Sequence, residues 1–228
     1  MMLPLRRIAL IASFAGTAGL CTTTFSLADS QRILLERVDG AVEYLPQGVA
    51  RPLPVAGRLV VRPEDYAITE RRSMATLALP DSSLIAIGSA TKVRVGSFSA
   101  EGGVSSMSVA IMGGALHFSI RHPQGGHANY IFTTPTTQIA IRGTEGMIVV
   151  RPGETIVACV HGTVNDTMVT TRDGRRISLP VGMTLTVQSA GRTRVRMSML
   201  RGVSGPEFKQ FASIVARNHA MRSKGSSR

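Results

Sequence analysis

Short segments in which apolar and polar residues alternate run through most of the chain, and this period of two limits its fold more than any other feature. Successive side chains of a β-strand point to opposite faces, so the pattern predicts strands with one buried face. The apolar positions of these segments are Ala75, Leu77 and Leu79, Ile85 and Ile87, Val93 and Val95, Leu116, Phe118 and Ile120, Ile139 and Ile141, Leu185 and Val187, and Val195 and Met197.

Glycine- and proline-containing pairs separate the alternating segments at intervals of about ten residues or a little more, as in all-β folds. They are Pro80-Asp81, Gly102-Gly103, Gly113-Gly114, Gly125-Gly126, Pro152-Gly153 and Asp173-Gly174. No stretch before residue 200 has a helical period of useful length. The sequence therefore predicts an all-β domain over residues 29–200, with many short strands in an elongated β-sandwich or a β-solenoid-like arrangement.

The carboxyl end, residues 201–228, has a different character. After Pro206, the residues Phe208, Phe211 and Val215 are spaced so that they would share one face of a helix. The pattern predicts a C-terminal helix followed by a basic tail. Two roles remain open for this helix: it packs on the β core, or it docks a partner.

The amino terminus has the layout of a secretory signal peptide. The pair Arg6-Arg7 precedes an uncharged apolar stretch over residues 8–20, and small residues lead up to Ala28 and Asp29. We predict a signal peptide over residues 1–28, cleaved between Ala28 and Asp29, and a mature protein in the periplasm or outside the cell. The apolar stretch is short for a membrane span, so we expect none in the mature chain, with an uncleaved anchor as the alternative.

The chain carries a net charge of +12, but its basic residues are dispersed and never form a run longer than two. This distribution gives little support to nucleic acid as a partner, and we expect none. An anionic envelope polymer, either peptidoglycan or lipopolysaccharide, is a second possible partner. The arginines that could bind it are Arg58, Arg62, Arg71, Arg72, Arg94 and Arg121.

Removal of residues 1–28 would leave a single cysteine, Cys159, which cannot form a disulfide within the chain. It lies in a β-branched run, residues 155–160, that predicts a strand buried on both faces. We interpret Cys159 as a small apolar core residue.

Two patterns resemble catalytic or metal sites, and both are incomplete. The run Ser89-Ala90-Thr91-Lys92 matches S-x-x-K, but that motif needs a helix, and here the flanking residues predict strands. His117, His122 and His127 are evenly spaced but have no fourth ligand or acid nearby in sequence. We interpret His117 as a solvent-facing strand residue. We therefore expect no catalytic residue, no metal and no cofactor, and a protein that is not an enzyme.

The most distinctive motif lies at residues 134–149. It reads Thr134-Pro135-Thr136-Thr137-Gln138-Ile139-Ala140-Ile141-Arg142-Gly143-Thr144-Glu145-Gly146-Met147-Ile148-Val149. This run resembles the T-P-x-A-x-x-x-V-R-G-T-x-F-x-V segment of FecR-type domains, which are periplasmic modules named for the ferric-citrate sensor of Gram-negative bacteria. Further matching steps extend the resemblance over residues 38–190. Its departures include Gly146 in place of phenylalanine and Ser82 in place of glycine.

The resemblance implies a non-enzymatic interaction or signalling-accessory module that contacts an envelope protein. In the sensor proteins this domain follows an anti-sigma segment and a transmembrane helix. The present sequence shows neither, so it resembles the stand-alone secreted form of the family.

The middle of the motif, Arg142-Gly143-Thr144, also has a physical interpretation. The neighbouring isoleucines should point inward, which places Arg142 on the outer side together with Gln138 and Ala140. A glycine in strand sequence predicts a bulge or a close backbone approach, and the Thr144 hydroxyl could bond the backbone of that bend. Ligand binding by Arg142 is the alternative to a structural corner. The residues assigned to the structural motif are Thr134, Pro135, Arg142, Gly143 and Thr144.

Overall fold

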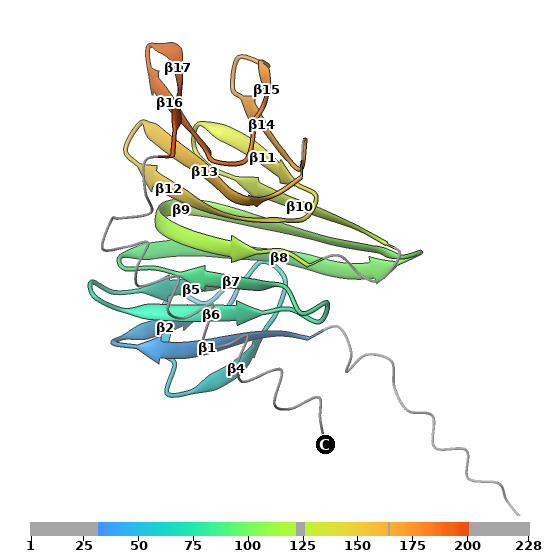
Figure 1. Ribbon diagram of the computed structural model, residues 1–228. Coiled ribbons are helices and arrows are strands. Elements are labelled where there is room, and N and C mark those ends of the chain that lie inside the picture. Colours follow the sequence, from blue (N-terminus) through green and yellow to red (C-terminus); the bar gives the residue numbers. More distant parts are fainter. Residues whose placement is uncertain (1–31, 122–125, 164, 201–228) are drawn as a thin grey trace, which may run out of the picture.

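The structure, a computed structural model, describes residues 32–121, 126–163 and 165–200. These residues form strands and connecting turns without any helix, so the all-β prediction is confirmed (Figure 1). None of them belongs to a helix that could cross a membrane. The predicted cleavage site at Ala28 and the predicted C-terminal helix lie outside the described residues.

Seventeen strands follow one another along the described chain. Their bounds are β1 (Ile33–Asp39), β2 (Val42–Leu45), β3 (Leu53–Pro54), β4 (Arg58–Val61), β5 (Tyr66–Thr69), β6 (Met74–Ala78), β7 (Leu84–Ile87), β8 (Thr91–Glu101), β9 (Val104–Ser119), β10 (His127–Thr133), β11 (Thr137–Ile141), β12 (Thr144–Arg151), β13 (Glu154–Gly162), β14 (Thr167–Thr171), β15 (Arg176–Ser178), β16 (Met183–Ala190) and β17 (Arg192–Met199).

The strands form one mixed, hydrogen-bonded sheet that is folded into two layers. In layer A the order is β4-β1-β6-β7-β9-β12-β13-β16-β17, and in layer B it is β3-β2-β5-β8-β9-β10-β11-β14-β15. Strand β9 belongs to both layers, and its pairing with β10 is parallel. The strands stack from β4 at one end of the molecule to the β14–β15 and β16–β17 hairpins at the other (Figure 1).

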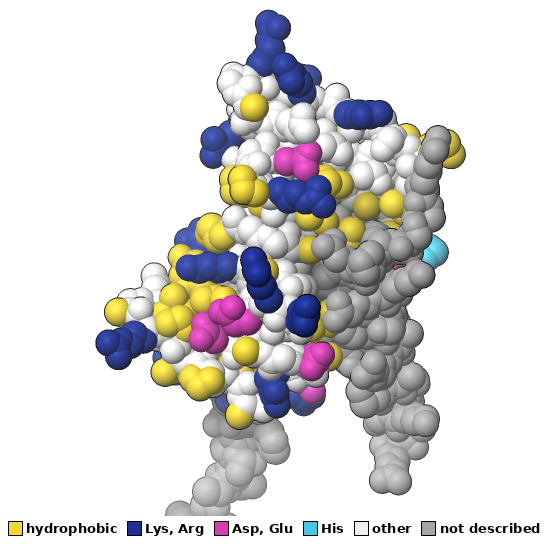
Figure 2. All heavy atoms as spheres, turned by 90° about the vertical axis from the view of Figure 1, so that its left-hand side faces the viewer, with side chains coloured by type: hydrophobic (Ala, Val, Ile, Leu, Met, Phe, Trp, Pro, Cys, Tyr) yellow, Lys and Arg dark blue, Asp and Glu magenta, His cyan; other side chains and the backbone are white. Residues whose placement is uncertain are grey.

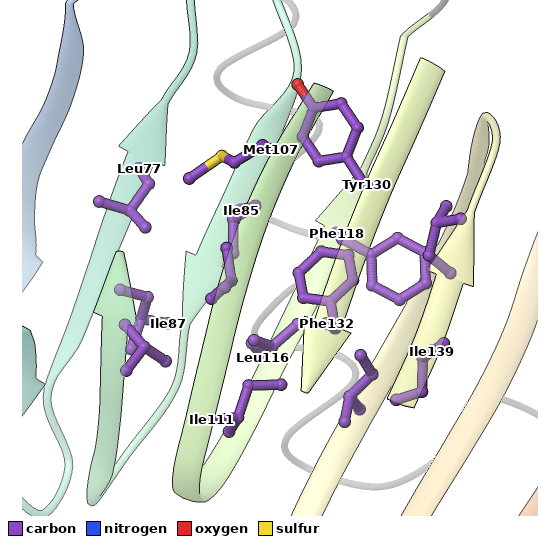
Figure 3. Close-up of a cluster of buried hydrophobic side chains, with 14 of the residues drawn as sticks. Leu77, Ile85, Ile87, Met107, Ile111, Leu116, Phe118, Tyr130, Phe132 and Ile139 are labelled. Carbon is purple, nitrogen blue, oxygen red and sulfur yellow. The ribbon is translucent and has the colours of Figure 1, made fainter. Parts of the chain in front are cut away.

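The core lies between the two layers and is built from the inward-facing residues that the period of two predicts. Phe118 of layer A stacks on Phe132 of layer B with their ring centroids 5.3 Å apart. Leu77, Ile85 and Ile139 extend this cluster along the stack of strands (Figure 3). The chain has no tryptophan, and aliphatic side chains, Tyr130 and a few phenylalanines fill this space.

The turn predicted at Gly113-Gly114 is wrong. Both glycines lie within β9, at the point where the strand leaves layer B and enters layer A. Gly114 has a φ of +97°, and a Cβ there would lie 2.5 Å from the Cα of Thr91. The pair Gly113-Gly114 therefore bends one long strand across the sandwich. The pairs Gly102-Gly103 and Pro152-Gly153 each form a turn between two strands, as predicted.

Candidate functional site

The residues that suggested S-x-x-K chemistry have other partners in the structure. Ser89 lies in the turn before β8, and its Oγ accepts a hydrogen bond from the backbone N–H of Arg72 at 2.8 Å. Lys92 lies in β8, and its Nζ stands 4.8 Å from the centre of the Tyr66 ring. The strand context that argued against a helical S-x-x-K site is confirmed.

The prediction that His117 faces solvent is wrong. Only 2% of its side chain is exposed, and its Nε2 lies 3.0 Å from Oε1 of Glu145. His117 is on the outer face of layer A, as the alternation implies, but there its cross-strand neighbours are Ala86 and Met147. The period of two identifies which side of the strand the histidine is on, and it carries no information on whether that side is covered.

His127 does not join His117. His127 is exposed at the start of β10, in layer B, and His122 lies outside the described residues. Over the described ranges, no three side chains of His, Cys, Asp or Glu are grouped as a metal site would require. Cys159 is buried in β13 as predicted, with its Sγ 3.5 Å from Oγ1 of Thr144.

The first half of the FecR-like motif closes the turn between β10 and β11. The Oγ1 of Thr134 accepts hydrogen bonds from the backbone N–H groups of Thr136 and Thr137, at 3.2 and 3.0 Å. The same oxygen lies 2.9 Å from Oγ1 of Thr155 in β13, which belongs to the other layer. These buried hydroxyls satisfy one another and tie the turn to layer A.

The second half of the motif carries the chain from layer B to layer A. Between β11 and β12, the backbone N–H of Arg142 donates to the carbonyl of Asp166 at 2.9 Å, and Gly143 has a φ of +136°. The Thr144 hydroxyl donates to the carbonyl of His161, in the neighbouring strand β13. Its partner is thus the next strand of layer A, whereas the sequence interpretation placed it in the bend itself.

The Arg142 side chain is exposed on the outer face of layer B, on the same side as Gln138 and Ala140. A shallow groove of about 380 Å³ lies on this face. Its lining residues are Ile131, Gln138, Ala140, Arg142, Asn165, Met168, Thr170 and Arg176. Two guanidinium groups beside an apolar floor suit an extended ligand with acidic groups better than a buried small molecule.

Strand β17 is the long free edge of the described sandwich. The other strands at the sheet edges are short: β3 has 2 residues, β15 has 3 and β4 has 4. Strand β17 has 8 residues and pairs with β16 on one side. Among the described residues no strand pairs with its other side, which is the arrangement that permits another chain to add a strand.

The hydrogen-bond pattern shows which backbone groups face the free side of β17. The N–H of Leu200 donates to the carbonyl of Gly182 at 2.7 Å, so in an antiparallel pair the bonded residues continue at Ser198 and every second residue before it. The backbone groups of Thr193, Val195, Met197 and Met199 therefore point outward. The Thr193 carbonyl accepts from the Arg175 guanidinium at 2.9 Å, which agrees with this direction.

The side chains of β17 divide into two rows. Arg192, Arg194 and Arg196 alternate on one side of the strand, while Val195 packs against the core from the other. Met197 and Met199 are 40% and 76% exposed. The sequence predicts a strand around Val195 and Met197, but only the sheet order shows that this strand is an edge.

Comparison with protein families agrees with the resemblance inferred from the 134–149 motif. Residues 65–165 match the family described as FecR protein, so the resemblance is confirmed. A comparison with curated proteins finds no match. Two crystal structures of a "putative anti-sigma factor" from Parabacteroides distasonis, at 1.65 and 2.50 Å resolution, are similar to the chain with a TM-score of 0.48 and 12% identity. The similarity covers 59% of this chain and 59% of that protein.

Proposed function

Since residues 65–165 match the FecR protein family, we propose that the protein is an exported, non-catalytic binding module of the bacterial envelope with a signalling-accessory role. Its partner is another envelope protein, which it binds by strand addition at the free side of β17. The observation that carries this proposal is the length of that edge: eight residues, against two to four at the other edges of the described sandwich.

Strand addition at β17 would form backbone hydrogen bonds without rearranging the sandwich. The outward-facing N–H and C=O groups of Val195, Met197 and Met199 supply the ladder. Met197 and Met199 supply exposed apolar surface for alternate side chains of the partner strand. The arginine row on β17 favours a partner strand that carries acidic residues on the facing side.

The arginines of β17 also support the second candidate, a binder of anionic peptidoglycan or lipopolysaccharide. Two of the arginines assigned to this role from the sequence are already ion-paired: Arg58 with Glu36 at 2.8 Å and Arg94 with Glu64 at 2.7 Å. Lys and Arg side chains are dispersed over the face shown in Figure 2 and do not merge into one cationic patch. The protein partner is therefore the preferred proposal.

In-cell photo-crosslinking tests the proposal at the level of single positions. A photoreactive residue replaces Met199 on β17, and matched chains carry it at Leu53 on β3 or at Asn129 on the outer face of layer B, all three exposed. We expect a crosslinked envelope protein from position 199 alone. Equal crosslinking from all three positions would contradict a specific edge site.

Ionic strength separates the two candidates. Binding through arginine–polymer contacts weakens steeply as salt rises, because exposed charge pairs are screened, whereas a backbone ladder is much less affected. We expect crosslinking from position 199 to persist when a cell lysate is brought to about 0.5 M salt before irradiation, where the Debye length is only a few ångströms. Its loss there, together with retention on purified peptidoglycan at low salt, would favour the polymer.

A further inference from the structure

The two layers of the sandwich differ on their outer faces. On layer B this face is open: Ser108, Asn129 and Gln138 are exposed. On layer A it is closed, although its residues point away from the core. Ala86 is 0% exposed and Ala115 is 7% exposed, and Met74 and Val149 are also buried. These four residues form a second cluster that is separate from the core between the layers.

The buried outer face of layer A is continuous across five strands. The cross-strand register aligns Thr76, Ala86, His117, Met147 and Ala158 in one row, from β6 to β13. Met147 and Ile156 extend the apolar cluster toward β16. The described strands make two layers only, with short connections between them, and none of these strands forms a third layer over this row (Figure 1).

We propose that the carboxyl-terminal segment, residues 201–228, covers the outer face of layer A through the apolar stripe Phe208, Phe211 and Val215. The position of the chain end supports this occupant. Strand β17 lies at the edge of layer A, so the chain leaves the sandwich beside this face. From β17 to β6 is six strand spacings, about 30 Å, and the remaining residues can span that distance even with a helix of three turns.

The chemistry of the segment matches the face. The small side chains of Ala86 and Ala115 leave a shallow floor between the larger Met74, Met147 and Ile156, on which phenylalanine rings can pack. Glu145 lies two residues from Met147, and Glu154 lies two residues from Ile156, so both carboxylates are on the outer face of layer A. Glu145 pairs there with His117 and Glu154 with Arg151, and both carboxylates remain partly exposed. The segment contains six Lys and Arg residues and one acid, Glu207, which is complementary to these carboxylates.

Disulfide trapping tests the proposal in the exported protein. In a Cys159→Ala background, Phe211→Cys is combined with Met147→Cys on the outer face of layer A. The matched control combines Phe211→Cys with Ala140→Cys, a half-buried position on the outer face of layer B. A second pair, Phe208→Cys with Ile156→Cys, tests a slightly different position of the apolar stripe along the outer face of layer A.

We expect an intramolecular disulfide with Met147→Cys or Ile156→Cys, formed several-fold more completely than with Ala140→Cys. Non-reducing electrophoresis and peptide mapping distinguish the products. Equal trapping on both layers, or none on layer A, would overturn the proposal. Disulfide-linked dimers with Met147→Cys would show instead that a second copy covers the face.

A fluorescence measurement checks the same contact without a crosslink. The chain has no tryptophan, so Phe211→Trp reports its own environment alone. We expect blue-shifted emission that turns red when Met147→Asp is added, and that is unchanged by Ala140→Asp on layer B. Emission at the wavelength of free tryptophan before any second change would contradict packing.

Discussion

At the scale of single residues, Gly114 is a position where both the backbone conformation and the neighbouring backbone exclude a side chain. A side chain there would meet the Cα of Thr91 at 2.5 Å and the carbonyl of Ala90 at 2.7 Å, and the φ of +97° disfavours any residue with a Cβ. Both obstacles are backbone atoms, which cannot move aside as a flexible side chain can. The crossing of β9 from one layer to the other therefore depends on this glycine.

We predict that Gly114→Ala destabilises the domain by about 3 kcal/mol or more, from the unfavourable φ and the collision together. Gly113→Ala is the matched control, because a Cβ at that position meets no atom within 4 Å. Chemical denaturation of both variants measures the difference. Equal stabilities would show that β9 bends without the constraint described for Gly114.

Tyrosine hydroxyls give the domain a dependence on alkaline pH. Tyr130 is fully buried in the core, and its hydroxyl donates to Oδ2 of Asp81 at 2.6 Å. Burial, followed by the Asp81 charge, raises the pKa of Tyr130 well above its usual range. Burial and the Tyr44–Asp65 hydrogen bond raise the pKa of Tyr44 to about 12.

We expect the free energy of unfolding to fall as pH rises above 10. Both tyrosines stay neutral in the folded state while the unfolded chain loses these protons, so the stabilisation is complete below pH 10 and is lost above it, for Tyr44 up to about 12. Tyr130 alone contributes a slope of about 1.4 kcal/mol per pH unit in that range. Urea unfolding at pH 9 to 11 should show a shallower slope for Tyr130→Phe, and an unchanged slope would contradict this assignment.

Sequence patterns predict some of these residues and leave others hidden. The inward positions of β9 and the buried Cys159 follow from alternation and from β-branched neighbours. The bond between Tyr130 and Asp81 joins residues 49 positions apart, and no local pattern indicates it. Alternation predicts the correct side of the strand for His117, but the prediction that this side faces solvent is wrong. Whether the outer face of layer A is buried depends on tertiary contacts.

At the scale of elements, β10 shows how the period of two divides one strand between two environments. Phe132 is buried against Phe118 in the core, while its neighbour Ile131 lines the shallow groove on the outer face of layer B. Both are large apolar residues in the same strand. We therefore expect the difference in their burial to decide how much each contributes to the free energy of unfolding.

Phe132→Ala should lower the free energy of unfolding by about 3 to 5 kcal/mol, because it leaves a cavity between the layers. Ile131→Ala should cost clearly less, since the groove is open to solvent and water can occupy the space. Thermal and urea unfolding of the pair provide the measurement. Similar losses for both variants would mean that the outer face of layer B is also covered.

The elements were predicted more securely than their connections. Alternation located β6, β7, β8, β11 and β16, because each has apolar residues two apart. It could not show that Gly113-Gly114 bends a strand that changes layers, since a glycine pair is equally suited to a turn. Nor could it show that β17 is the long free edge, because strand order depends on contacts distant in sequence.

At the scale of the whole molecule, packing between the two layers holds the domain together. The described part of the chain has one cysteine and no disulfide, and its core runs the length of the sandwich. The FecR-like motif and the alternation together anticipated this architecture over most of its length. Which outer face is covered, and by what, could not be predicted, because it depends on tertiary contacts of the layers.

We predict that a chelator and a thiol reductant leave the thermal unfolding curve of the protein without residues 1–28 unchanged. The reason is that the packed core, with its single buried thiol, accounts for the stability of the described domain. A large fall in the melting temperature with chelator alone would contradict this account and indicate a metal site that the described residues do not form by themselves.

The measurement that tests the central claim most directly is partner binding by Met197→Pro, compared with Met197→Thr. The N–H of Met197 faces the free side of β17, so proline removes one group from the proposed ladder and none from the pairing with β16. Threonine keeps that N–H and suits a strand. Both variants lose the Met197 side chain, so the difference between them isolates its N–H. For the partner identified by crosslinking from position 199, we predict that Met197→Pro binds at least tenfold more weakly than Met197→Thr, about 1.4 kcal/mol, and that both variants keep the melting temperature of the original chain. Undiminished binding by a folded Met197→Pro protein would contradict strand addition at β17.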